Sequence, residues 1–112
     1  MDLQRILPLA PRDLLILAVL AEGPNHGYGL IKAVEARSQA GVLLDPANLY
    51  RVLRRMRTEG WIEESPDTDG DPRRRTHRIT EAGRRVLDAE LARLERLLGQ
   101  ARPALADGRG AP

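Results

Sequence analysis

The segment 44–60 has the clearest boundaries in this sequence, and it limits most strongly what the chain can form. Asp45 can cap free helix amides, Pro46 suits a first helical position, and Gly60 suits the end of a helix. Between these ends, four apolar residues recur at the spacing of a single buried stripe: Leu49, Val52, Leu53 and Met56. The spacing therefore predicts an amphipathic helix over this segment.

The flanking patterns place this helix third in a short series. Apolar periodicity predicts helices over 11–21 and 28–38, and another that begins near Thr80 and continues to about Ala101. Between the third and last helices, residues 61–64 and 75–80 read as two strands, joined by a turn-rich stretch over 65–72. This order predicts a mainly α (α+β) fold, a winged helix-turn-helix with an additional C-terminal helix.

The division of the chain follows from this order. We expect a winged-helix DNA-binding domain over residues 1–80, of which 1–10 form an N-terminal arm. Residues 81–102 would form a dimerisation helix, and 103–112, rich in Pro, Gly and Ala, a disordered tail. No apolar run approaches the roughly 20 residues of a membrane span, and the first residues lack a secretory signal pattern. Together with the absence of cysteine, these features favour a cytoplasmic protein without a membrane partner.

Charge is distributed unevenly along the chain. The net charge is only +2, but residues 51–85 carry ten basic and seven acidic side chains, a balance of +3. The third helix contains no acidic residue from 46 to 58, although mixed charges stabilise an ordinary exposed helix. A face that carries only arginines is better explained by contact with double-stranded DNA. The alternative is an arginine-rich surface that only faces solvent.

Individual roles on this face follow from side-chain chemistry. Asn48 can bind adenine and Arg51 can bind guanine through two hydrogen bonds each in the major groove. Arginines further along suit phosphate contacts, which fix the register of the protein on DNA. An arginine triplet where the hairpin returns would extend these contacts. The full set of expected DNA-binding residues is Ala47, Asn48, Tyr50, Arg51, Arg54, Arg55, Arg57, Arg73, Arg74 and Arg75.

The last helix carries a leucine seam with 4-3-4 spacing, which is typical of helices that pair. A helix of about 20 residues spans about 30 Å, so part of the seam should project beyond so small a domain. We therefore expect a homodimer, although packing against the chain's own core is the alternative. The expected dimerisation residues are Ile6, Leu7, Leu87, Leu91, Leu94 and Leu98.

Enzymatic and metal sites find little support in the sequence. The two histidines, His26 and His77, are far apart and have no acidic residue at ligand spacing within one helix. The stretch 67–71 resembles a calcium loop only superficially, because its glycine is misplaced and no glutamate follows at the required distance. We expect no catalytic residue, no metal and no cofactor.

Several stretches form a set with a characteristic order and spacing: Leu17-Ala18-Val19-Leu20 with Gly23-Pro24, His26-Gly27-Tyr28-Gly29, Leu49-Tyr50 with Leu53 and Met56, Glu59-Gly60-Trp61-Ile62, and Arg78-Ile79-Thr80-Glu81-Ala82-Gly83. Together they resemble the PadR family of regulators. The resemblance implies a dimeric repressor that binds an inverted repeat and is released by a small molecule near the dimer interface. Two departures stand out: Ala47-Asn48 replaces the usual Gly-Thr pair, and His77 replaces an aromatic residue.

From the residues themselves, a small hydrophobic effector would fit between the last helix, the first helix and the apolar arm residues Ile6, Leu7 and Leu9. Trp61 most plausibly packs in the core, since it stands at a strand start. Two other binding proteins remain open, a MarR-like regulator and a winged-helix module that binds only protein. An enzyme is a further alternative.

Overall fold

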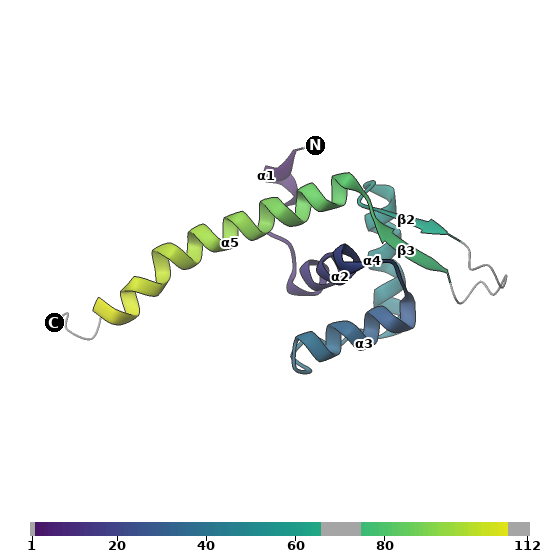
Figure 1. Ribbon diagram of the computed structural model, residues 1–112, viewed down its shortest axis with the longest axis horizontal. Helices are drawn as coiled ribbons and strands as arrows, with labels where there is room; N and C mark the ends of the chain where they lie inside the picture. Colours follow the sequence, from purple (N-terminus) through teal and green to yellow (C-terminus); the bar gives the residue numbers. More distant parts are fainter. Residues whose placement is uncertain (1, 66–74, 108–112) are drawn as a thin grey trace.

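A computed structural model describes residues 2–65 and 75–107 of the chain. The elements in chain order are α1 (Leu3–Ile6), α2 (Pro11–Glu22), β1 (Asn25–His26), α3 (Gly27–Arg37), α4 (Pro46–Thr58), β2 (Ile62–Ser65), β3 (Thr76–Ile79) and α5 (Glu81–Asp107). Helices α2, α3 and α4 pack together beside a small sheet, and α5 extends away from them (Figure 1). The predicted helices and strands occur in the predicted order, and the structure adds α1 in the N-terminal arm and the short strand β1.

The core lies between α2, α3, α4 and the first turns of α5. Ile16 and Leu17 of α2 are fully buried, as the all-round apolar character of this helix predicts. They pack with Leu30 of α3, Leu53 of α4 and Val86 of α5. Trp61 is also buried within this cluster, which confirms the core position expected for it.

The sequence signals at the ends of α4 act as predicted. The Asp45 side chain accepts a hydrogen bond from the Asn48 amide at 2.9 Å, and Pro46 occupies the first turn. Gly60 follows the helix with φ at +81°, a left-handed conformation that glycine adopts without strain. These two ends fix where α4 starts and where the chain turns into β2.

The sheet has three antiparallel strands in the order β1-β3-β2. Ile62 pairs with Ile79 and Glu64 with His77, so β2 and β3 form the expected hairpin. The sequence did not predict β1, a two-residue strand in which Asn25 pairs with His77. Strand β3 is therefore central, and its His77 is buried between neighbours on both sides.

The start of α5 is tied closely to the strand hairpin. Thr80 donates to the Gly60 carbonyl at 2.6 Å and accepts from the Gly83 amide at 3.1 Å, so it caps the helix as predicted. A Cβ on Gly83 would lie only 2.2 Å from the Trp61 carbonyl oxygen. Glycine at this position allows the helix to approach β2 so closely.

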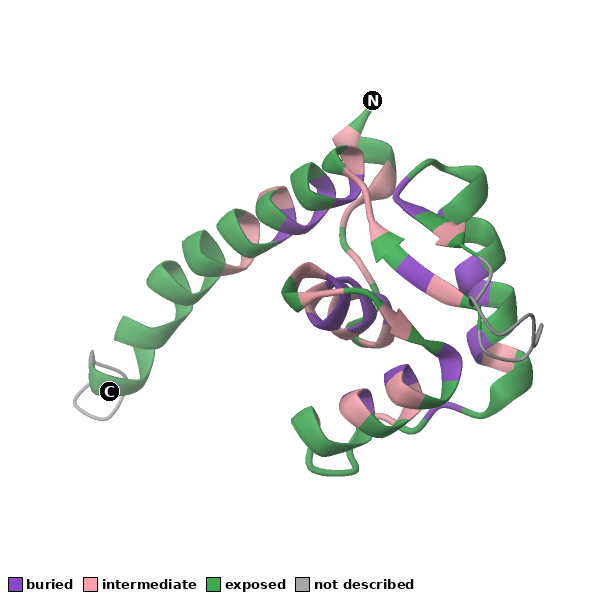
Figure 2. Ribbon diagram, turned by 45° about the vertical axis from the view of Figure 1, so that its right-hand side comes forward, coloured by how far each residue is buried: buried purple, intermediate pink, exposed green. Residues whose placement is uncertain are grey.

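Helix α5 is longer than the sequence predicted. It continues to Asp107, so residues 103–107, assigned to a disordered tail, are helical. Alanine and leucine in this stretch are strong helix formers, and they continue the helix past Pro103. With 27 residues, α5 is about 40 Å long. Its outer half is exposed on all sides (Figure 2), and the molecule measures 65 × 32 × 22 Å.

Candidate nucleic-acid interface

Helix α4 separates into a buried face and an exposed basic face. Its apolar stripe is buried, whereas Ala47, Tyr50, Arg51 and Arg54 are exposed. The absence of acidic residues from 46 to 58 leaves this face without internal charge compensation along the helix. The exposed face of α4 is therefore basic, and the helix lies beside the hairpin (Figure 1).

The first turns of α4 hold a hydrogen-bonded chain of three side chains. The Asn48 amide nitrogen donates to Asp45 Oδ2 at 2.7 Å, and the Arg51 guanidinium donates to Asn48 Oδ1. Asn48 is half-buried, and Arg51 is exposed. The two residues predicted to recognise bases thus contact each other as well as the helix cap.

Two further residues of the predicted set keep an accessible position. Arg54 is exposed and makes no ion pair with any other residue in the part of the chain that the structure describes. Tyr50 is 55% exposed, and its hydroxyl lies at the start of α3, where a Cβ on Gly27 would be 3.8 Å away. Both side chains lie where a duplex facing α4 could be contacted.

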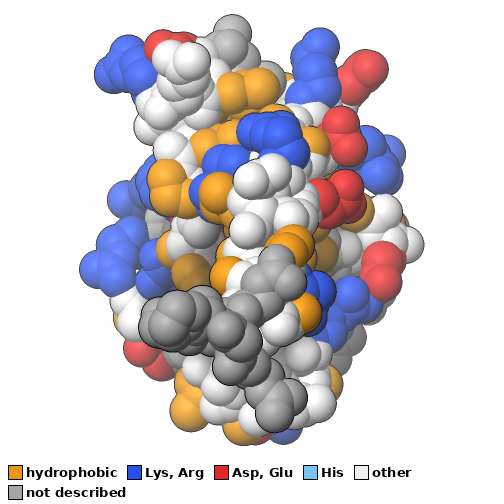
Figure 3. Space-filling model, turned by 90° about the vertical axis from the view of Figure 1, so that its left-hand side faces the viewer, with side chains coloured by type: hydrophobic (Ala, Val, Ile, Leu, Met, Phe, Trp, Pro, Cys, Tyr) orange, Lys and Arg blue, Asp and Glu red, His pale blue; other side chains and the backbone are white. Residues whose placement is uncertain are grey.

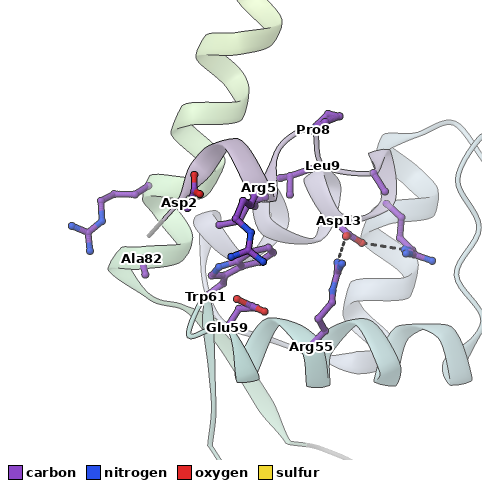
Figure 4. A pocket seen from close by; sticks show the side chains of 13 residues that line it. Asp2, Arg5, Pro8, Leu9, Asp13, Arg55, Glu59, Trp61 and Ala82 are labelled. Carbon is purple, nitrogen blue, oxygen red and sulfur yellow. Dashed lines mark hydrogen bonds and ion pairs between the residues drawn. The ribbon is translucent and has the colours of Figure 1, made fainter.

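Arg55 does not point away from the protein with the others. Its guanidinium forms an ion pair with the buried carboxylate of Asp13 in α2, and it lies 6.0 Å from the centre of the Trp61 ring. Figure 4 shows Asp13 between Arg55 and a second arginine, which is Arg12 at 3.1 Å. The Arg55 side chain thus joins α4 to α2, and it remains 53% exposed.

Arg57 in the last turn of α4 and Arg75 next to β3 are also engaged within the protein. Arg57 and Arg75 both form ion pairs with Glu64 on β2. Partial burial raises the pKa of the Glu64 carboxyl, but the Arg75 hydrogen bond and the charge of Arg57 outweigh it, so this pKa lies below its usual value. Arg73 and Arg74 lie outside the described residues. Glu64 therefore neutralises part of the positive charge that the sequence assigned to DNA.

The predicted dimerisation residues fall into two groups. Leu87 is buried against its own chain, and Ile6 and Leu7 are half-buried against the core. Leu91 and Leu98 are exposed, with Leu94 half-buried between them. The sequence missed Leu97 and Leu105, which are also exposed. Figure 3 views the molecule from the end where α5 projects, and hydrophobic and basic side chains are interspersed there.

A cavity of about 950 Å³ lies where the arm, α2, α4 and the start of α5 meet. Ile6, Leu9 and Trp61 contribute apolar surface to it, close to the place expected for an effector. The cavity is more polar than that expectation, however, since four arginines line it: Arg5, Arg12, Arg55 and Arg85. In Figure 4, the Arg5 side chain extends from the arm toward the part of the cavity that Trp61 and Glu59 also line.

Two other kinds of site were tested against the structure. Within the described residues, no group of three or more His, Asp or Glu side chains could hold a metal ion. Nor does any helix in that part of the chain have the length and apolar character needed to cross a membrane.

Comparisons with known proteins agree with this geometry. Residues 16–89 match the transcriptional regulator PadR-like family. A 37.1 kDa protein in transposon TN4556 of Streptomyces fradiae is 34% identical over 88 residues, which are 79% of this chain. The chain spans about a quarter of that protein's length, 24%.

Solved structures show the same fold. A PadR family transcriptional regulator from Eggerthella lenta superposes with a TM-score of 0.65 and 28% identity, covering 85% of this chain and 84% of that one. Bacillus subtilis PadR in complex with operator DNA gives a TM-score of 0.65 and 20% identity, covering 75% of this chain and 47% of that one. The predicted winged-helix fold class is confirmed.

Proposed function

This chain belongs to the transcriptional regulator PadR-like family, and from that premise we propose that it is a cytoplasmic repressor that binds an inverted-repeat operator in double-stranded DNA as a homodimer. Members of the family are transcriptional regulators and not enzymes. The observation that carries the proposal is the exposed basic face of α4, which bears Arg51 and Arg54, with the half-buried Asn48 beside them.

The chemistry of this face supports base recognition at its N-terminal end. In helix-turn-helix proteins, the first residues of the recognition helix contact base edges in the major groove. Asn48 and Arg51 hold this position and would read adenine and guanine. Arg54, one turn further, would bind a phosphate, with Ala47 and Tyr50 at the edges of the contact. Bacillus subtilis PadR, which shares this fold, is known in complex with operator DNA.

The exposed leucines of α5 support the homodimer. Leu91, Leu97 and Leu98 lie along the projecting helix, where burial against a second copy would remove apolar surface from water. A dimer with two-fold symmetry would present two α4 helices to half-sites about one helical turn apart. This symmetry is the reason to propose an inverted repeat as the operator.

The cavity at the base of α5 supports control by a small effector. Its apolar side chains suit the hydrophobic ligand expected from the sequence, while its four arginines and three acidic residues, Asp2, Asp13 and Glu59, offer partners for polar groups on that ligand. Because Arg55 of α4 lines this cavity, a bound ligand would touch the recognition helix itself. Release of DNA requires that the ligand bind one arrangement of the two heads more tightly than the other.

The alternative is a winged-helix module that binds protein only, and salt dependence separates the two. Fluorescence anisotropy of a labelled random-sequence duplex, titrated at about 50 and 200 mM salt, should show affinity falling at least tenfold, because arginines release counterions on binding. A surface that binds only protein has no reason to bind the duplex at either salt concentration. Equal affinity at both would contradict DNA binding through α4.

A further inference from the structure

Asp45 makes two different hydrogen bonds to Asn48. One carboxylate oxygen accepts from the Asn48 backbone amide at 2.9 Å, which caps α4. The other oxygen accepts from the Asn48 side-chain amide nitrogen at 2.7 Å. An ordinary helix cap requires only the first of these bonds. The second acts on the side chain that faces DNA in the proposed function.

Arg51 completes the arrangement from the opposite side. Its guanidinium donates to Asn48 Oδ1, so the amide nitrogen points toward Asp45 and the amide oxygen toward Arg51. If the amide turned over, its oxygen would face a carboxylate and its NH₂ group would face a guanidinium. Both new contacts would repel, because each would pair two acceptors or two donors.

We propose that Asp45 is a positioning residue for DNA recognition: together with Arg51, it locks the Asn48 amide in one orientation, so that α4 selects adenine at one position of each half-site. The inference rests on the proposed function. One N–H and one lone pair of the amide are used within the protein, and one of each remains. This remaining pair is what adenine N7 and N6 require.

The hydrogen bond between Arg51 and Asn48 also determines which base is recognised next to the adenine. Arg51 donates one N–H to Asn48 and keeps others for guanine O6 and N7. Residues 48 and 51 are separated by about 4.5 Å along the helix axis, which is close to the roughly 3.4 Å between stacked base pairs. The two residues therefore read an adenine and a guanine at adjacent base pairs.

Asp45→Asn tests the positioning role without removing the helix cap. Asparagine caps helices as well as aspartate does, but its NH₂ group cannot accept a hydrogen bond from the Asn48 amide. Glu63→Gln, on the exposed edge of β2, is the matched control, because it removes an equal charge outside the Asp45–Asn48–Arg51 chain. Circular dichroism melting should show both variants folded, and Asp45→Ser, which also keeps the cap, replaces Asp45→Asn if that variant is not.

The measurement is selection of bound fragments from a randomised duplex pool, followed by affinities for single-base variants of the selected site. The wild type should select an adenine next to a guanine and prefer that adenine by about 10-fold or more. Asp45→Asn should lower this preference by about 5-fold or more, while its affinity for the random pool stays equal or rises through loss of a negative charge. Glu63→Gln should keep the wild-type preference.

A double variant identifies the route of the effect. If Asp45 acts through Asn48, Asn48→Ala should abolish the same preference, and adding Asp45→Asn should change it no further. An unchanged adenine preference in folded Asp45→Asn would overturn the positioning role and leave the proposed function intact. If the wild-type protein selected no sequence motif, both the positioning role and the proposed function would be contradicted.

Discussion

The guanidinium of Arg55 on α4 reaches the carboxylate of Asp13 on α2, which is only 3% exposed. The two residues are 42 positions apart in the chain, so this ion pair joins the proposed recognition helix to the central helix of the core. Arg12 provides the second partner of the same carboxylate. The orientation of α4 on the protein depends in part on this contact.

Replacing Arg55 with alanine should therefore affect the stability of the protein, whereas replacing Arg54 with alanine should affect its binding to DNA. Arg55→Ala leaves a buried carboxylate with one partner fewer, and we expect the free energy of unfolding to fall by about 1–2 kcal/mol. Arg54→Ala removes an exposed side chain and should leave stability unchanged. It should instead lower the salt dependence of DNA binding by about one phosphate contact per subunit.

Urea unfolding and duplex titrations over a series of salt concentrations measure both quantities on each variant. If Arg55→Ala lowered the salt dependence and left the urea midpoint in place, Arg55 would be a phosphate contact after all. The pair is well matched, because both residues are neighbouring arginines on one helix.

A second buried carboxylate connects the N-terminal arm to α5. Glu90 is 1% exposed, forms an ion pair with Arg93 and accepts a hydrogen bond from the Leu9 amide at 2.7 Å. The hydrogen bond from Arg93 lowers the pKa of Glu90, burial opposes this by raising it, and the Leu9 amide lowers it further, so the pKa lies below its usual value. Ionised Glu90 thus stabilises the folded state.

This stabilisation should disappear in acid. Because the pKa in the folded state is below the unfolded value of about 4.3, the contribution is complete above that pH and is lost as pH falls toward the folded pKa. Glu90→Gln should unfold more easily at neutral pH, by about 1–3 kcal/mol, and show a shallower acid dependence. Glu95→Gln, exposed on the same helix, is the control for charge alone. Parallel pH curves for wild type and Glu90→Gln would contradict this account.

Local signals predicted the fold well because they act within a few residues. The caps at Asp45 and Thr80, and the glycine after α4, set helix ends through contacts three or four residues away. Apolar periodicity then placed the core faces of α2 and α4. The end of α5 was missed because the stretch that starts at Pro103, rich in Pro, Gly and Ala, was interpreted as a disordered tail, although Pro103 lies inside the exposed helix.

The partners of the arginines were not predictable in the same way. Nothing in the local sequence around Asp13 links it to Arg55, which lies 42 positions further along the chain. Glu64 forms ion pairs with both Arg57 and Arg75, because the fold brings the end of α4 and the start of β3 beside β2. By contrast, the Asp45–Asn48–Arg51 chain spans seven residues of one helix start, and its i, i+3 spacing was visible in the sequence.

His77 should make stability depend on pH near neutrality. It is 3% exposed on the central strand, and its Nδ1 finds no hydrogen-bond partner among the described residues. Burial lowers the pKa of His77, Glu64 opposes this by raising it, and the charges of Arg57 and Arg75 lower it further, with a net lowering. Between the folded pKa and the unfolded value of about 6.5, the unfolded chain binds more protons, so stability falls as pH falls through this window.

The variant His77→Phe should remove that dependence and raise stability by about 1 kcal/mol at neutral pH, since no unpaired buried nitrogen remains. Urea unfolding from about pH 8 to about pH 5 measures both effects. His26→Phe is not a suitable control, because His26 caps α3 through its Nδ1. His26→Asn keeps that cap and should retain the pH dependence of the wild type. If the free energy of unfolding of His77→Phe still fell as the pH fell through this range, the pH dependence would have to come from another group.

The outer half of α5 offers a direct test of the homodimer. Leu98 is 53% exposed and lies three turns beyond Leu87, which is 8% exposed in the chain's own core. Leu98→Glu should therefore leave the head folded and place a charge only in the interface between copies, where it has no partner. Sedimentation should show monomers, and operator affinity should fall steeply because two linked heads bind far more tightly than one.

Two further variants of α5 separate association from folding. Gln100→Glu adds the same charge two residues further along the exposed helix, and it should stay dimeric. Leu87→Ala leaves a cavity in the core and should cost about 2–5 kcal/mol in unfolding free energy. The wild-type melting temperature should rise with protein concentration, as expected when folding and association are coupled, whereas that of Leu98→Glu should not. A folded Leu98→Glu that still sedimented as a dimer would move the interface to another part of the molecule.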